Sequence, residues 1–203
     1  MTQALRKTVT FAEFVSWKPD GELYELHDGV VVKMAQPLGG HEEVTGFLSI
    51  QLAVQCYQSR LPYLIPKTAL VKPIDSESAY SPDILILNQA NLMNEPLWQQ
   101  ESTVSQAASI PLVIEVVSSN WRDDYYKKYG EYEGIGIREY WIVDYLGLAA
   151  KKFVGDPKQP TISIYSLVDD EYQVIQFKGD DCIQSPTFPE LNLTAKQIFQ
   201  AGS

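Results

Sequence analysis

The sequence predicts an α/β protein in which helices flank a mixed β-sheet, with additional β-hairpins around it. The clearest sign is a strand–helix–strand pattern over residues 112–144, because parallel strands need a long crossover connection. A second sign is Asp28-Gly29 between two short apolar runs, which is typical of a hairpin. No GxGxxG fingerprint and no P-loop occurs, so the pattern does not indicate a doubly wound nucleotide-binding fold.

The 203 residues have an ordinary globular composition, with 45% hydrophobic and 21% charged residues. This composition excludes wholesale disorder, collagen and coiled coil, and we expect one domain over residues 1–203. The formal net charge of −10 disfavours binding to phosphate backbones or anionic membranes through charge alone. Cys56 and Cys182 fit neither a metal-binding pattern nor a disulfide framework.

The sequence carries no sign of a membrane or export segment. Residues 1–8 have no apolar run after Arg6 and Lys7, so we expect no signal peptide. No apolar stretch reaches the length of a membrane-spanning helix. We therefore expect a cytoplasmic protein with no membrane partner.

Local patterns predict the elements of the first half of the chain. Thr10 and Glu13 form a capping box that opens a helix, and His27 is expected to be a turn residue of the hairpin. Val44, Leu48 and Leu52 share one helical face. The predicted features are a helix from residue 10, a hairpin over 23–34, a chain break at Gly39-Gly40, a helix over 41–60 and one or two strands within 63–73.

Apolar runs predict the elements of the second half. Three buried strands lie over 84–87, 112–117 and 139–144, and a polar loop covers 88–109. A helix over 121–133 is expected to stop at Gly134 and Gly136. The remaining predictions are strands over 149–154, 161–166 and 172–177 and a helix over 194–200.

Two carboxylates interrupt or precede the apolar strands. Glu115 lies inside the second strand, where an isolated carboxylate is costly unless it alternates outward to solvent. Asp83 follows Pro82 at the start of the first strand, which is also a common way to open a turn. Together these two residues provide the clustered oxygen ligands that a hard divalent cation requires.

The charge distribution around these carboxylates points the same way. No basic residue occurs between Lys72 and Arg122, and such a segment should attract cations. A solvated acidic face would explain most of these acids but not Glu115. The acidic residues of this interval are Asp75, Glu77, Asp83, Glu95, Glu101 and Glu115.

The helix after Glu115 offers a countercharge. At about 100° per residue, an aromatic stripe of Trp121, Tyr125, Tyr129 and Tyr132 faces the sheet. Lys128 and Asp124 lie at the edge of this stripe, whereas Lys127 and Asp123 point away. Lys128 can therefore reach the sheet and assist an attacking water. The alternative is an exposed Asp124–Lys128 pair on the helix surface.

The order and spacing of these motifs resemble a large family of uncharacterised bacterial restriction-endonuclease-like proteins, which carry a variant of the PD-(D/E)XK nuclease core. The resemblance implies a restriction-endonuclease-like sheet over a core of about residues 10–144. The strand patterns that follow predict a β-rich extension over about 149–203, which we expect to extend the sheet or supply an interface. The matching positions are Tyr24-Glu25-Leu26-His27-Asp28-Gly29, Met34, His41 (otherwise expected to be a capping or surface residue), Ser81-Pro82-Asp83, Glu115, Asp124, Lys128, Tyr132, Gly136 and Glu139-Tyr140-Trp141.

The resemblance also implies roles for individual residues. Asp83 matches the Asp of the PD element and Glu115 the second acidic position, while Val117 stands where the usual motif has its lysine. Lys128 matches a lysine that has moved to the following helix in this family. Glu25 matches a further acidic position. The implied ligands of Mg²⁺ or Mn²⁺ are Asp83, Glu115, Glu25 and the backbone carbonyl of Val116.

Three functions are compatible with these patterns. The first is a metal-dependent nuclease whose substrate is nucleic acid. The second is a binding or assembly module with weak or absent catalysis, in which exposed strand edges of the C-terminal region form a homodimer. The third is a metal-dependent hydrolase of a small phosphoester, which the acidic surface suits better than a long polyanion.

Overall fold

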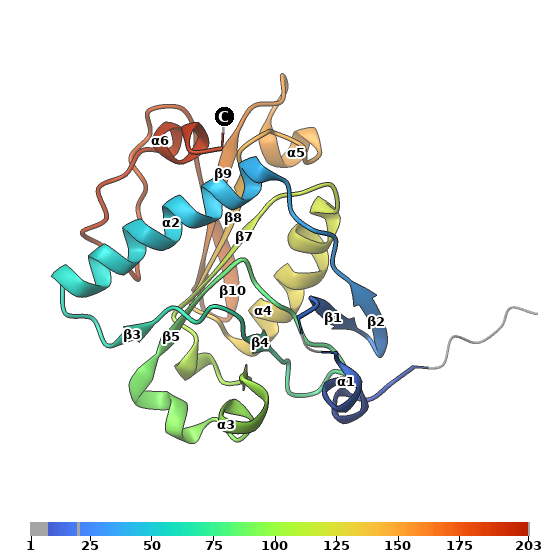
Figure 1. The fold of residues 1–203 in the computed structure, drawn as a ribbon. Helices are drawn as coiled ribbons and strands as arrows, with labels where there is room; N and C mark the ends of the chain where they lie inside the picture. Colours follow the sequence, from blue (N-terminus) through green and yellow to red (C-terminus); the bar gives the residue numbers. More distant parts are fainter. Residues whose placement is uncertain (1–7, 20, 203) are drawn as a thin grey trace, which may run out of the picture.

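The structure is a computed structural model that describes residues 8–19 and 21–202 (Figure 1). Residues 1–7, on which the expectation of no signal peptide mainly depends, lie outside the described residues. No helix among the described residues is both long and apolar enough to cross a membrane.

The centre of the molecule is a six-stranded mixed sheet with the strand order β10-β9-β8-β7-β5-β3. β7 and β8 are parallel, and every other neighbouring pair is antiparallel. This arrangement confirms the predicted mixed sheet and shows that β9 and β10 extend it. The strands are β3 (Tyr63–Leu64), β5 (Ile84–Asn88), β7 (Leu112–Val116), β8 (Glu139–Asp144), β9 (Thr161–Val168) and β10 (Glu171–Phe177).

The predicted strand–helix–strand unit is confirmed, because a helical segment joins the parallel strands β7 and β8. Its first part is a π-helix, η3 (Asp123–Lys128), and its second part is an α-helix, α4 (Tyr129–Ile135). The prediction that Gly134 stops this helix is wrong, since Gly134 lies inside α4. Gly136 alone ends it, in the left-handed conformation with φ of 86°.

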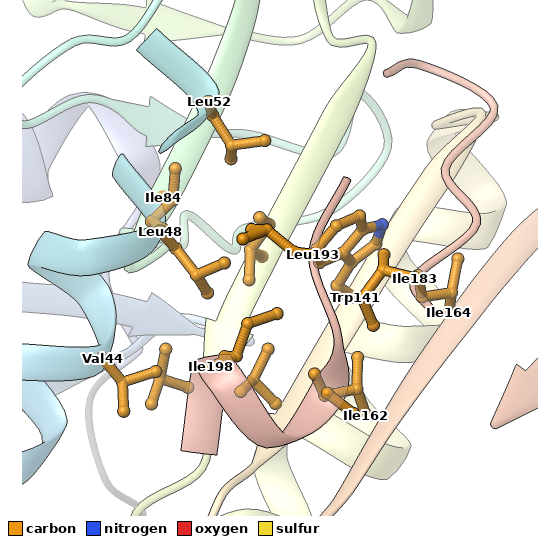
Figure 2. Close-up of a cluster of buried hydrophobic side chains, with 14 of the residues drawn as sticks. Val44, Leu48, Leu52, Ile84, Trp141, Ile162, Ile164, Ile183, Leu193 and Ile198 are labelled. Carbon is orange, nitrogen blue, oxygen red and sulfur yellow. The ribbon is translucent and has the colours of Figure 1, made fainter. Parts of the chain in front are cut away.

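Helices pack on both faces of the sheet. The long helix α2 (Gly39–Gln58) and the C-terminal helix α6 (Ala195–Gln200) cover one face (Figure 1). Figure 2 shows Val44 and Leu48 of α2 and Ile198 of α6 pointing into this core. Tyr125 and Tyr132 cover the other face. Because both faces are buried, the central strands read as continuous apolar runs.

A smaller unit packs beside the sheet. The hairpin of β1 (Tyr24–His27) and β2 (Val30–Lys33) confirms the predicted turn at Asp28 and Gly29. The short helix α1 (Phe11–Trp17) begins with the predicted capping box. An apolar cluster holds this unit together and contains Phe11, Phe14, Leu26, Leu70 and Ala79. The hairpin carries Glu25 toward the sheet.

Residues 88–109, predicted as a polar loop, contain several short elements. Buried Glu95 organises them by accepting hydrogen bonds from the backbone N–H groups of Ser105 and Gln106, both at 3.0 Å. Such tertiary hydrogen bonds leave no periodic trace in the sequence. The elements are η1 (Gln89–Asn94), α3 (Trp98–Glu101), β6 (Thr103–Val104) and η2 (Ala107–Ser109); β6 pairs in parallel with β4 (Leu70–Val71).

Two further local predictions are wrong. The strand expected over 149–154 is a single helical turn, α5 (Lys151–Val154). Ala and Lys favour helix over strand, which outweighs the apolar pair Phe153-Val154. The break expected at Gly39-Gly40 is instead the first turn of α2. Position 40 requires glycine, because a Cβ atom there would lie only 2.8 Å from the carbonyl oxygen of Gly202.

Candidate active site

The candidate site lies at one end of the central strands, where β7 ends and β5 begins. β5 and β7 are antiparallel, and Ile84 pairs with Ile114. Extending this register by one residue places Asp83 opposite Glu115, so two strands far apart in sequence bring these carboxylates to one edge. Glu115 is 2% exposed and lies on the face of the sheet that packs against η3 and α4.

Lys128 lies at the centre of the site. Its Nζ atom is 3.1 Å from Oε2 of Glu115, 3.2 Å from Oε1 of Glu25 and 3.7 Å from Oδ1 of Asp124. All four side chains are buried. The ammonium group therefore joins three elements, namely β1, β7 and the π-helix η3.

The same ammonium group lowers the pKa of both glutamates, but their net pKa shifts are opposite. Burial alone would raise the pKa of Glu25, but Lys128, His27 and the N–H group of Ser81 together lower this pKa to about 2. Burial raises the pKa of Glu115 well above its usual value, although Lys128 opposes this, and the neighbouring carboxylates add to the increase. Burial also disfavours the charged form of Lys128, yet the surrounding carboxylates hold its pKa well above the usual value.

Asp124 adds a further titratable carboxyl group. Burial raises its pKa to about 7 despite the nearby Lys128, and the charges of Asp83 and Glu25 contribute. Lys128 and Asp124 are four residues apart in η3. Two carboxyl groups with raised pKa values beside a third that stays ionised are typical of a functional site.

Asp83 is linked to the site through the backbone of Val116. Its Oδ2 atom accepts a hydrogen bond of 2.7 Å from the Val116 N–H group. His41, at the start of α2, lies 3.0 Å from the Val116 carbonyl oxygen and 3.3 Å from the same Asp83 oxygen, both through Nε2. The Asp83 side chain is 25% exposed. One carboxylate of the site thus faces solvent while Glu25 and Glu115 are enclosed.

Neighbouring side chains orient the buried carboxylates. The Tyr132 hydroxyl donates to Oε1 of Glu115 at 3.0 Å. His27 forms a 2.7 Å contact between its Nε2 atom and Oε2 of Glu25. Both contacts leave the opposite oxygen of each glutamate directed at Lys128. The carboxylates are therefore fixed before any ligand binds.

The structure brings together the residues that the sequence singled out. Glu115 does not alternate outward to solvent, so that alternative is wrong. The Asp124–Lys128 pair exists, but it is buried rather than on the helix surface. Lys127 points away, as expected, and its Nζ atom lies 2.7 Å from Asp28. Of the acidic interval between Lys72 and Arg122, Glu95 is used for backbone hydrogen bonding instead.

The sequence-based interpretation missed both histidines. His41 was expected to cap a helix or lie at the surface, and His27 to be a turn residue; both are buried beside site carboxylates. A signal existed for each of them. His41 continues the apolar helical face of Val44 and Leu48, and His27 lies two residues from Glu25, which puts both on one face of a strand.

The donor chemistry of the site fits a hard divalent cation. Asp83, Glu115, Glu25 and the Val116 carbonyl offer only oxygen atoms, which Mg²⁺ and Mn²⁺ prefer. Four carboxyl groups, including that of Asp124, surround the single Lys128 ammonium, and a bound cation would favour the ionised forms of Glu115 and Asp124, whose pKa values are raised. Among the residues that the structure describes, no three His, Cys, Asp or Glu side chains are already gathered as ligands of one ion.

Comparisons with known proteins agree with this fold. A crystal structure described as a putative nuclease belonging to DUF820, from Anabaena variabilis ATCC 29413, superposes with a TM-score of 0.73. It is 16% identical, and the match covers 96% of this chain and 99% of that chain. No curated protein matches the sequence. The model of the Uma2 family, described as "Putative restriction endonuclease", matches residues 11–196, and the chain therefore belongs to this family.

Proposed function

We propose that the protein is a divalent-metal-dependent nuclease that hydrolyses phosphodiester bonds in nucleic acid. Membership of the Uma2 family and the nuclease-like fold support this function. The observation that carries the proposal is the buried Lys128 among Glu25, Glu115 and Asp124. A structural ion pair needs one carboxylate, whereas this cluster contains two further carboxyl groups with raised pKa values whose ionised forms a bound cation would stabilise.

In this proposal, Asp83 and Glu115 would hold Mg²⁺ or Mn²⁺, with Glu25 and the Val116 carbonyl as further ligands. The ion would lower the pKa of a bound water and neutralise charge on the scissile phosphate. Lys128 positions the attacking water and stabilises the negative charge that develops on the phosphate oxygens. Glu25 and Glu115 orient its N–H donors at 3.2 and 3.1 Å.

Two side chains act through these groups. His41 donates through Nε2–H to the Val116 carbonyl oxygen, beside Asp83, and so fixes the backbone that carries the proposed carbonyl ligand. Tyr132 holds Glu115 in the orientation that its contact with Lys128 requires. We regard both as positioning residues.

A cleavage assay with labelled single- and double-stranded DNA and RNA, at low salt with Mg²⁺ or Mn²⁺, tests the proposal. The parent protein should cleave at least one of these substrates, and Glu115→Gln should reduce the rate by at least a hundredfold. The matched control Glu171→Gln, at an exposed glutamate of β10, should retain the parent rate. Thermal unfolding of each variant separates loss of activity from loss of fold.

The remaining outcomes discriminate between the candidate functions. Equal cleavage by the parent and Glu115→Gln would show that the assigned site is wrong. No cleavage by the parent under any condition would contradict a nuclease and favour a binding module or a small-substrate hydrolase.

A further inference from the structure

A cluster of aromatic rings, with two basic side chains over it, lies on the solvent side of η3 and α5. The rings of Trp121, Tyr126 and Phe153 form its surface, with centroids of 5.6 to 6.3 Å between neighbours. Tyr125 stacks on the inner side of Phe153 at 4.2 Å and anchors the group to the core. Tyr126 is 49% exposed, so its ring is accessible from solvent.

Two exposed cations lie directly on these rings. The guanidinium of Arg122 is 4.5 Å from the centre of the Trp121 ring. The ammonium of Lys152 is 4.8 Å from the centre of Tyr126 and 4.6 Å from that of Phe153. In a protein with net charge −10, these two cations place positive charge beside partly exposed aromatic rings.

The topology places this surface at the same sheet edge as the candidate site. The helical segment with Trp121 follows β7, and α5 follows β8; because β7 and β8 are parallel, both connections leave the same edge. The π-helix η3 presents buried Lys128 on one side and exposed Tyr126 on the other. Asp144, the last residue of β8, accepts from the N–H groups of Leu148 and Ala149 and so fixes the turn that leads to α5.

We propose that this surface binds an unpaired strand of nucleic acid and guides it toward the candidate site. Bases would stack on Tyr126 and Trp121 as Arg122 and Lys152, which lie over these rings in the free protein, turn outward to contact phosphates. Aromatic stacking on successive bases is the usual mode for single strands, and it does not depend on sequence. Paired bases hide their faces inside the duplex, so a duplex could use only the few cations. The proposal deepens the nuclease function by specifying single-stranded substrate.

Binding of a fluorescein-labelled 20-nucleotide oligo(dT), measured by anisotropy in EDTA, tests this surface without cleavage. The double variant Tyr126→Ala/Lys152→Ala should weaken binding at least fivefold, because it removes one stacking ring and one phosphate contact. The single variant Lys152→Ala should reduce the slope of log Kd against log salt by about 0.7. The matched control Tyr57→Ala/Lys67→Ala removes an exposed tyrosine and an exposed lysine elsewhere, and it should bind like the parent.

The outcomes keep the two proposals separate. The proposed single-strand surface would be contradicted if the parent and Tyr126→Ala/Lys152→Ala bound oligo(dT) equally. It would also be contradicted if a 20-base-pair duplex bound more tightly than the single strand. Absence of oligo(dT) binding by the parent would overturn it as well. Metal-dependent cleavage lost in Glu115→Gln would support the nuclease in each of those cases. Binding without any cleavage would support the surface and contradict the nuclease.

Discussion

Lys128 owes its charged state to the carboxylates that surround it. Replacing it with Met leaves Glu25 and Glu115 buried without the ammonium, and breaking a buried ion pair from one side costs about 3–5 kcal/mol. We therefore expect Lys128→Met to lower the free energy of unfolding in urea at pH 8 by this amount. The matched variant Lys127→Met removes a partly exposed contact with Asp28 and should cost no more than about 1 kcal/mol.

The pH dependence of the stability difference between the parent and Lys128→Met shows whether unpaired charge causes the destabilisation. Without Lys128, Glu25 loses the main group that lowers its pKa, so it binds a proton at higher pH than in the parent. The stability difference between the parent and Lys128→Met should shrink as the pH falls from 8 to 5. A difference that stays constant over this range would show that lost packing, rather than unpaired charge, destabilises the variant.

The raised pKa of Asp124 predicts a further pH dependence of stability, whereas the previous one depends on the lowered pKa of Glu25. Burial raises its pKa to about 7 from an ordinary 3.8, so the folded state binds its proton more tightly than the unfolded state. The resulting stabilisation is complete below about pH 4 and is lost as the pH rises through 7. Relative to Asp124→Asn, the parent should lose at most about 1.4 kcal/mol per pH unit in this window. Parallel stability curves for the two proteins would refute the raised pKa.

The site residues differ in how much the sequence revealed about them. Glu115 could be predicted because a carboxylate inside an apolar run is costly without a partner. Lys128 could be chosen over Lys127 because helical periodicity sets it beside the aromatic stripe. His41 and His27 could have been found from the same periodicities. The link between Asp83 and Val116 could not, because it depends on the register of β5 against β7.

In the segment that joins β7 and β8, the α-helical periodicity correctly selected Asp124 and Lys128 as inward-facing, although the helix type is different. The prediction assumed 100° per residue, but residues 123–128 form a π-helix, whose hydrogen bonds span five residues. The wider turn brings Asp124 and Lys128, four residues apart, closer to one line along the helix. Nothing in local propensity distinguishes this geometry from an ordinary helix, and π-helical segments occur frequently at functional sites.

The end of this segment allows a matched test with two glycines. Gly134 lies inside α4, and a Cβ atom there would meet nothing within 4 Å. Gly134→Ala should therefore stabilise the protein by about 0.5–1 kcal/mol, since Ala is the better helix former. Gly136 has φ of 86°, so Gly136→Ala should destabilise by about 1 kcal/mol or more. Thermal unfolding measures both; equal signs for the two variants would contradict the assigned helix end.

At the scale of the whole molecule, the elements with strong internal patterns could be predicted and the others could not. β7, β8 and α2 carry continuous or periodic apolar residues over several turns or a whole strand. Two buried acceptors hold segments that lack such patterns: Glu95 organises the short elements within 88–109, and Asp144 fixes the turn that leads to α5. Such hydrogen bonds form only when the surrounding fold is in place.

The whole-molecule consequence of the proposed metal site is a linkage between metal binding and stability. An ion that binds only the folded state adds about 2.7 kcal/mol at a hundred times its Kd, which for a chain of this length raises Tm by about 5–10 °C. We expect Mn²⁺ to raise the Tm of the parent and of the surface control Asp170→Asn. Asp83→Asn should abolish the increase.

The choice of Asn at position 83 separates metal binding from folding. The amide oxygen of Asn can still accept the hydrogen bond from the Val116 N–H group, so the edge between β5 and β7 is preserved while the negative charge is lost. An unchanged Tm without metal, together with loss of the Mn²⁺ effect, would place the ion at this carboxylate. Equal stabilisation of Asp83→Asn and the parent by Mn²⁺ would place the ion elsewhere and contradict the assigned ligands.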